Sequence, residues 1–337
     1  MNAEPAQPPL AVIDSADALQ RVRAQLAEVG MSVPDVDPSV TRAVDESLFR
    51  AVPEQLRSRV STPSLDAAEA SDGNAAIAPE AFPANPGPDG PNYHWTNDLL
   101  ARVLAGKPLD PVVLQRVAGS FFDAPDIPAA SRELEAQGKS LYGPGTPVFV
   151  GNSMICTLAV AGYDAQGNKV GITAGHCGKV GDAVMSADSW KIGPSGRVVA
   201  SNPGQDYAVI QFGENAEVTR SYNGVTVNSV GGAPAPGQTV CKSGVGTGTT
   251  CGITWSTQPR VILTQVCAMQ GDSGGPVTQG DRLVGTVSGG AYPNYALACR
   301  SPLQGPLHMP TVVSRADATM ADLNASGGPG AGFQLAG

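Results

Sequence analysis

The strongest constraint on the fold is the position of the cysteines. All six lie after residue 142, and so do 34 of the 41 glycines. The part that follows residue 142 is about 195 residues long, rich in Gly and Thr, with short apolar runs between turns. This pattern is typical of an all-β domain, and the length is sufficient to bury a core. We therefore expect two unlike parts that meet near residue 142.

The charges divide at the same place. Residues 1–142 carry 20 acidic and 11 basic side chains, and residues 143–337 carry 10 of each, so the first part holds the whole formal charge of −9. Without a basic excess, binding to nucleic acid is not expected, and no apolar run approaches the length of a membrane span. The first residues are not a signal peptide, because they lack a charged start and an apolar core.

The first part predicts short helices separated by loops. Ser15–Gly30 has apolar residues at helical spacing before a closing glycine. Asp110-Pro111 offers an N-cap and a first helical residue, with Leu114 and Val117 following at helical spacing. Residues 61–92, rich in Pro, Ala, Asp and Gly, predict a flexible linker. A further helix ending near Gly106 is expected from apolar residues that share a face, namely Trp95, Leu99, Val103 and Leu104.

The second part predicts an all-β sandwich or barrel, because glycine or polar turns separate short apolar runs. The tail, residues 321–337, contains Gly and Pro, so we expect a loose or lightly docked end. The candidate strands are Pro147–Val160, Lys169–Thr173, Tyr207–Phe212, Gly224–Val230, Val261–Val266 and Leu283–Ser288.

Three local sequences in the second part carry the residue types of nucleophilic acyl transfer. They are TAGHC at Thr173–Cys177, DYAVI at Asp206–Ile210 and GDSGGP at Gly271–Pro276. The reaction needs a hydroxyl, a base that takes its proton, a carboxylate that orients the base, and N–H donors for the developing oxyanion. Each string alone has an ordinary interpretation as a strand end or a turn. Together, in the order His, Asp, Ser, they are far more specific.

This order and these strings resemble the chymotrypsin-fold serine peptidases, and more closely their secreted bacterial branch of the streptogrisin and alpha-lytic protease type. The resemblance covers about residues 145–315. It implies His176 as general base and then acid, Asp206 as its orienting carboxylate and Ser273 as nucleophile. The N–H groups of Gly271 and Ser273 would form the oxyanion hole.

The fold that the resemblance implies is a pair of six-stranded antiparallel β-barrels. A mainly helical or partly disordered N-terminal segment would precede them. Asp182 and Asp188 are rival partners for the histidine, but neither opens an apolar strand, so Asp206 is preferred.

Six cysteines allow 15 pairings, and the sequence alone leaves all of them open. The resemblance selects Cys156–Cys177, Cys241–Cys251 and Cys267–Cys299. Such bridges imply an oxidising compartment, and hence a secreted protein.

An ion pair is also implied by the bacterial branch, in which a basic residue after a loop cysteine pairs with the aspartate before the nucleophile; a solvated lysine is the alternative. Here Lys242 follows Cys241, so we expect Lys242 to pair with Asp272. Lysine lacks the bidentate fork of arginine, which is usual at this place.

The pocket for the residue before the scissile bond would lie between strands on either side of the serine loop. In the family that the chain resembles, a preference for basic residues needs an acid two residues before the loop cysteine, where this chain has Gln265, and Val284–Val313 contains no acid. We therefore expect a neutral pocket that favours large apolar residues. His308 lies where its far wall is expected, or is an ordinary hydrogen-bonded core residue. The pocket residues would be Gln265, Ala268, Ser288, Gly289, Gly290 and His308.

The domain organisation follows from position and composition. The resemblance implies that residues 1–142 are a pro-segment that inhibits the enzyme or assists its folding, with cleavage in 136–147. A separate acidic accessory region or a partly disordered stalk is the alternative. Residues 143–320 would be the peptidase domain. We expect a monomer that acts on polypeptides and needs no metal or cofactor.

Two rival functions use the same residues. An α/β-hydrolase would take Gly271–Gly275 as its nucleophile elbow, with Asp281 and His308 following in chain order. That elbow must open a helix, and Gly274-Gly275-Pro276 is poor helix sequence. A catalytically silent binding module is the second rival, although none of the three triad residues is missing.

Overall fold

The computed structural model describes residues 94–151, 154–292 and 297–337, together with eight residues between 11 and 61. The chain divides into two units, Met1–Ala78 and Pro79–Gly337. In the first unit, β1 (Ala11–Val12) pairs in parallel with β2 (Val60–Ser61). The helix expected at Ser15–Gly30 and the linker expected at 61–92 lie almost entirely outside the described residues.

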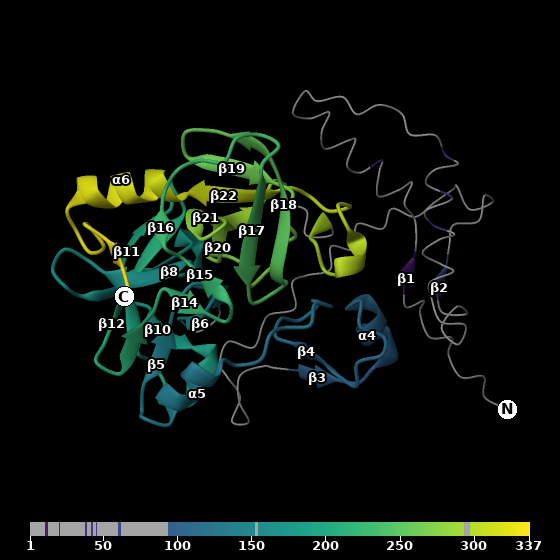
Figure 1. The fold of residues 1–337 in the computed structure, drawn as a ribbon, viewed down its shortest axis with the longest axis horizontal. Helices are drawn as coiled ribbons and strands as arrows, with labels where there is room; N and C mark the ends of the chain where they lie inside the picture. Colours follow the sequence, from purple (N-terminus) through teal and green to yellow (C-terminus); the bar gives the residue numbers. More distant parts are fainter. Residues whose placement is uncertain are drawn as a thin grey trace. The chain divides into compact units, whose positions relative to one another are not determined.

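The second unit contains two large sheets (Figure 1). The first has eight strands in the order β23-β8-β9-β12-β11-β10-β6-β7 and curls into a half-barrel. Fully buried side chains such as Val148, Leu158 and Ile210 fill it. Its strands are β6 (Pro147–Val150), β7 (Met154–Thr157), β8 (Val160–Tyr163), β9 (Lys169–Thr173), β10 (Ala183–Ser186), β11 (Gly196–Asn202), β12 (Tyr207–Phe212) and β23 (Gln334–Leu335).

The second sheet closes into a six-stranded barrel, because β21 pairs with β20 on one side and with β22 on the other. Strand β16 adds to it in parallel through β21. Val240, Ile262 and Val277 lie in its core. Its strands are β16 (Ser229–Val230), β17 (Thr239–Gly244), β18 (Gly248–Thr257), β19 (Val261–Thr264), β20 (Pro276–Gln279), β21 (Arg282–Gly290) and β22 (Thr311–Arg315).

Together the closed barrel and the curled half-barrel confirm the expected chymotrypsin-type fold class. Short elements connect the strands. They are η1 (Gly175–Cys177), η2 (Ala187–Ile192), β13 (Ala216–Val218), β14 (Ser221–Tyr222), β15 (Val225–Thr226) and η4 (Pro302–Gln304).

The described residues before 142 form small elements rather than a run of helices. A helix is found at α4 (Leu99–Leu104), but Trp95 lies in a strand, and the helix expected after Asp110 is wrong. Its residues form a strand that pairs antiparallel with the one containing Trp95, and this pairing buries Val113 completely. The elements are β3 (His94–Thr96), β4 (Val113–Gln115), α5 (Ala129–Glu135) and β5 (Ser140–Tyr142).

Residue 142 lies inside the first barrel. Strand β5 pairs in parallel with β13, and the Tyr142 ring, which is fully buried, stacks on Phe212 with 4.1 Å between ring centroids. The amino-acid composition changes at residue 142, but Tyr142 belongs to the same buried cluster as later residues of the first sheet.

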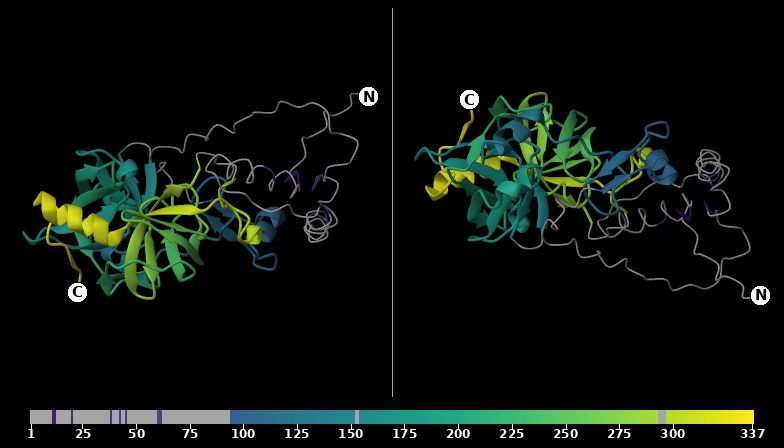
Figure 2. Two further views of the ribbon diagram at one scale, coloured as in Figure 1. Left: turned by 90° about the horizontal axis from the view of Figure 1, so that it is seen from above. Right: turned by 90° about the horizontal axis from the view of Figure 1, so that it is seen from below.

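The C-terminus is docked on the first sheet, which agrees with the docked rather than the loose form of the expected tail. Helix α6 (Ala316–Ser326) ends at Gly327, whose φ of +64° suits glycine. It buries Leu323, and the strand that follows it extends the first sheet by pairing with β8 (Figures 1 and 2). Buried apolar side chains therefore hold a segment whose Gly and Pro content predicts a loop.

Candidate active site

The three predicted triad residues come from three loops at the ends of strands. His176 lies in η1, directly after β9, and Asp206 directly precedes β12. Because β9 and β12 are neighbouring antiparallel strands, their ends bring these two residues together. Ser273 lies in the loop between β19 and β20 of the other barrel. The site is therefore built across the contact between the two barrels.

The structure brings the three side chains into one hydrogen-bonded chain. His176 Nδ1 is 3.0 Å from each carboxylate oxygen of Asp206, and His176 Nε2 is 2.8 Å from Ser273 Oγ. With the proton on Nδ1 donated to the carboxylate, Nε2 is free to accept the serine proton. The histidine side chain is 42% exposed, so a substrate in the cleft has access to it.

Asp206 is held in an uncommon backbone conformation, with φ of +50°. The backbone N–H of His176 donates to Asp206 Oδ1 at 2.9 Å, and the Ser288 hydroxyl donates to Oδ2 at 2.5 Å. Burial alone raises the pKa of this carboxyl, but the hydrogen bonds from His176 and Ser288 outweigh burial and lower its pKa. The carboxylate thus stays ionised beside the histidine.

The rival acids and the rival histidine are placed elsewhere. Asp182 accepts the backbone N–H of Lys179, and Asp188 accepts the Tyr222 hydroxyl. His308 is buried, and its Nδ1–H donates to the carbonyl oxygen of Met309 at 2.9 Å. Burial lowers its pKa. Strand β20 rather than a helix follows the serine loop, which does not fit the α/β-hydrolase elbow.

The serine loop is shaped by close contacts with the first barrel. The Thr157 hydroxyl donates to the Gly271 carbonyl at 2.7 Å, and the Thr157 N–H donates to the Ser273 carbonyl at 2.8 Å. Gly271 has φ of +90°, which favours glycine. Within the described residues, the N–H groups of Gly271 and Ser273 donate to no protein acceptor, which leaves both for a substrate oxygen.

Lys242 and Asp272 meet as expected, with 3.1 Å between Nζ and Oδ2 and both side chains fully buried. The other two donors of Lys242 reach the Thr247 hydroxyl and the Gly248 carbonyl. Asp272 also accepts the N–H groups of Gly246, Thr247 and Met269. Burial lowers the pKa of Lys242, although the charge of Asp272 opposes this.

All three disulfides that the resemblance selects are present: Cys156–Cys177, Cys241–Cys251 and Cys267–Cys299. The first joins β7 to the histidine loop, and the third joins the start of the serine loop to the segment before η4. Two of the three therefore tie the loops of the candidate site to the barrels.

The predicted pocket residues divide into structural and open positions. Gln265 uses its amide on the protein, donating to the carbonyls of Pro306 and His308 and accepting from the Trp255 indole. Ala268 is half-buried, and a side chain at Gly289 would meet open space. At Gly290 an added Cβ would collide with the side chain of Met309. Sequence reasoning missed Met309, Thr157 and Thr247, which no motif contains, and it placed Ser288 in the pocket without its bond to the carboxylate.

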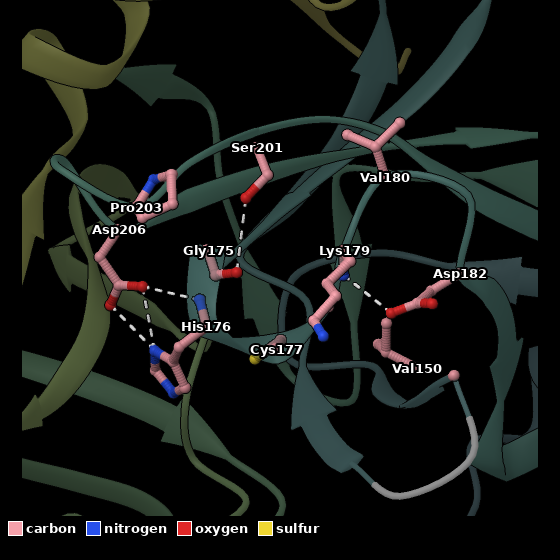
Figure 3. A pocket seen from close by; sticks show the side chains of 12 residues that line it. Val150, Gly175, His176, Cys177, Lys179, Val180, Asp182, Ser201, Pro203 and Asp206 are labelled. Carbon is pink, nitrogen blue, oxygen red and sulfur yellow. Dashed lines mark hydrogen bonds and ion pairs between the residues drawn. The ribbon is translucent and has the colours of Figure 1, made fainter.

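A cleft of about 610 Å³ opens beside the histidine (Figure 3). Lys179 and Asp182 supply charges at one end, and His176 and Asp206 lie at the other. The lining of the cleft consists of Val150, Gly151, Gly175, His176, Cys177, Gly178, Lys179, Val180, Asp182, Ser201, Pro203 and Asp206.

Comparison with known proteins matches residues 150–299 to the trypsin family. An uncharacterised protein of Mycobacterium tuberculosis is 36% identical over 155 residues, which are 41% of this chain and 66% of that protein. Streptogrisin-A of Streptomyces griseus is 31% identical over 173 residues, 45% of this chain and 56% of its own length. Serine protease 2 of Streptomyces fradiae is 29% identical over 163 residues, which are 44% of this chain and 93% of that protein.

A solved structure, protease A of Thermobifida fusca, is 28% identical with a TM-score of 0.45, covering 55% of this chain and 97% of that one. No helix among the described residues is long and apolar enough to cross a membrane. The chain spans just under two thirds of the mycobacterial relative and about half of streptogrisin-A. The matched region contains all six cysteines and all three triad positions. Residues 150–299 thus match the trypsin family, and this part of the chain is similar to bacterial chymotrypsin-fold serine peptidases.

Proposed function

We propose that this protein is a serine endopeptidase that hydrolyses peptide bonds through an acyl-enzyme intermediate. The observation that carries the proposal is the continuous chain from Asp206 through His176 to Ser273, with distances of 3.0 and 2.8 Å. A catalytically silent binding module does not require these three side chains to be aligned. It supports a working triad because the base lies within hydrogen-bond reach of the nucleophile and of its orienting carboxylate.

The proposed steps use atoms that the geometry brings together. Ser273 Oγ forms a bond to the carbonyl carbon of the substrate while its proton passes to His176 Nε2. The oxyanion that develops accepts hydrogen bonds from the N–H groups of Gly271 and Ser273. The C–N bond then breaks, and the amine leaves with the proton from Nε2. Water repeats the sequence on the acyl-enzyme, releasing the acid and restoring the serine.

Export and maturation belong to the same proposal. Three disulfides fit a protein that matures in an oxidising compartment, which supports secretion. The acidic residues before 142 would serve as a leader that aids folding or limits access until it is cut, in a chain that acts as a monomer on polypeptides.

A fluorophosphonate probe tests the proposed function directly. We expect one equivalent to label the full chain at Ser273, with loss of labelling in Ser273→Ala and in His176→Ala. Ser314→Ala is the matched control, because this serine of β22 is also buried but lies outside the triad. Absence of labelling in the unmodified protein, both before and after removal of the leader, would refute the peptidase proposal.

We expect Met309 to set the size of the residue accepted before the scissile bond. Its side chain packs on Gly290, on the proposed pocket wall, so Met309→Ala opens space for larger side chains. Relative to Leu substrates, kcat/KM for Phe substrates should rise by about tenfold, as for a change of one or two methylenes. Leu307→Ala, which alters a 64% exposed side chain, serves as the control. Peptide-library cleavage measures the ratio, and an unchanged ratio would exclude Met309 from the pocket.

A further inference from the structure

The segment before the predicted domain boundary is folded and is held by internal hydrogen bonds and an ion pair. Residues 98–124 are called here the leader brace. Asp98 caps α4 by accepting the Ala101 N–H at 2.9 Å. The Asp123 carboxylate accepts the Leu114 N–H at 2.7 Å and lies 2.5 Å from Lys107 Nζ. The first bond holds the start of α4, and the other two tie the C-terminal end of the leader brace to β4 and to Lys107.

The leader brace is bonded to loops of the peptidase domain. The Ser120 hydroxyl donates to the Gly246 carbonyl at 2.5 Å, and the Phe121 N–H donates to the Arg300 carbonyl at 2.7 Å. The Ser301 hydroxyl returns a bond to the Leu104 carbonyl at 2.6 Å. In Figures 1 and 2, α4 and β4 accordingly lie beside the segment around η4.

A buried ion pair anchors the leader brace to the first barrel. Arg116 Nη1 is 3.0 Å from Asp188 Oδ1, and the two side chains are 2% and 0% exposed. Loss of one partner from such a pair leaves a buried charge without its counterion, which is strongly unfavourable. Release of the leader brace would have to break this ion pair.

The leader brace touches the oxyanion loop at two points. Val117 covers Gly271: a Cβ on this glycine would lie 2.8 Å from Val117 Cγ2 and 2.9 Å from Val245 Cγ1. Ser120 binds the carbonyl of Gly246, and the N–H on the other side of that peptide group, from Thr247, donates to Asp272 at 3.0 Å. One peptide group thus links the Ser120 hydroxyl to the aspartate that precedes the nucleophile.

These contacts restrict a loop that glycine leaves free to move. Gly271 has no side chain to limit rotation of its peptide groups, and its N–H must point at the oxyanion position. An apolar side chain packed on its Cα and a fixed peptide at Gly246 limit that rotation. His176 remains 42% exposed, so the leader brace supports the loop without covering the histidine.

We propose that Val117 and Ser120 are positioning residues for the oxyanion hole, and that the leader brace stays bound to the peptidase domain after any cut between residues 125 and 142. The proposal rests on the proposed peptidase function. It makes this part of the leader a component of the working enzyme.

Kinetics test the positioning role. In Val117→Ala and Ser120→Ala we expect kcat for a peptide anilide to fall by about tenfold, less than the 10²- to 10³-fold lost with a whole oxyanion donor. KM should stay unchanged, and the inhibition constant of a peptide aldehyde should rise in step with the fall in kcat. Leu109→Ala is the matched control, since this side chain is 94% exposed. Unchanged kcat and inhibition constants, or a higher kcat, would overturn the positioning role.

A second measurement does not depend on activity. A recognition sequence for a specific protease replaces Ala136–Lys139, where the turn after α5 is exposed, in a Ser273→Ala chain that cannot cut itself. After cleavage we expect both fragments to elute together at the size of the intact protein. Separate elution under native conditions would overturn the retention of the leader brace. Failure of fluorophosphonate labelling, in contrast, would refute only the peptidase function.

Discussion

Replacing His176 with alanine is expected to lower kcat for peptide hydrolysis by about 10⁶-fold, the loss typical of removing a triad member. His176 contacts both the nucleophile, at 2.8 Å, and the orienting carboxylate, at 3.0 Å. Without it no base takes the serine proton. Ser273→Ala should cost about as much, and the double variant no more than either, because the residues act as a unit.

Steady-state hydrolysis of a peptide anilide measures this loss, with substrate binding followed separately through KM. The matched control is His308→Gln, which alters the other described histidine of the peptidase domain while keeping a group that can donate to the Met309 carbonyl. We expect near-normal kcat for this control. If His308→Gln lost activity and His176→Ala kept it, the triad assignment would be wrong and the order of the α/β-hydrolases would have to be reconsidered.

Replacing Lys242 with methionine is expected to destabilise the protein by roughly 3–5 kcal/mol, the cost of leaving a buried charge without its partner. Asp272 is fully buried, and the substitution would leave its carboxyl group without the lysine partner beside an apolar side chain. The loop that carries Ser273 should loosen as well, because Asp272 binds the N–H groups of Gly246, Thr247 and Met269. We therefore expect kcat to fall together with stability.

Urea denaturation measures the change in the free energy of unfolding. Lys139→Met is the matched control, since it removes a lysine from a largely exposed pair with Glu217, at 2.6 Å, and should cost no more than about 1 kcal/mol. Equal stability of the two variants, with full activity in Lys242→Met, would show that the buried pair has no structural role.

Strands buried on both faces were the most predictable elements. Lys169–Thr173 and Tyr207–Phe212 form strands at the expected bounds, because nearly every side chain in these apolar runs is buried. Strand β18 was not predicted. Most of its side chains are only partly buried or exposed, and glycine and threonine dominate its sequence, so it has no apolar run. Strand β4 was mistaken for a helix because Leu114 and Val117 satisfy helical spacing, whereas pairing with β3 decided the structure.

The candidate site was predictable where its residues lie in short strings. The histidine, aspartate and serine strings and the lysine after Cys241 identify side chains that meet in the structure. Contacts across long stretches of chain left no such signal. Ser120 and Gly246 are 126 residues apart, and Ser288 and Asp206 are 82 apart. These pairs come together only in the folded chain, so no local sequence motif predicts the contacts.

The pairing of Lys242 with Asp272 has a consequence for how such an enzyme is controlled. Proteolysis can activate a peptidase either by completing its catalytic groups or by opening its cleft to substrate. Here the counterion of the buried carboxylate is a side chain only 30 residues away in the same barrel, already in place in the uncut chain. Cutting the leader supplies no missing charge. Control of this enzyme would therefore act on the access of substrate to the cleft and not on the assembly of the catalytic groups.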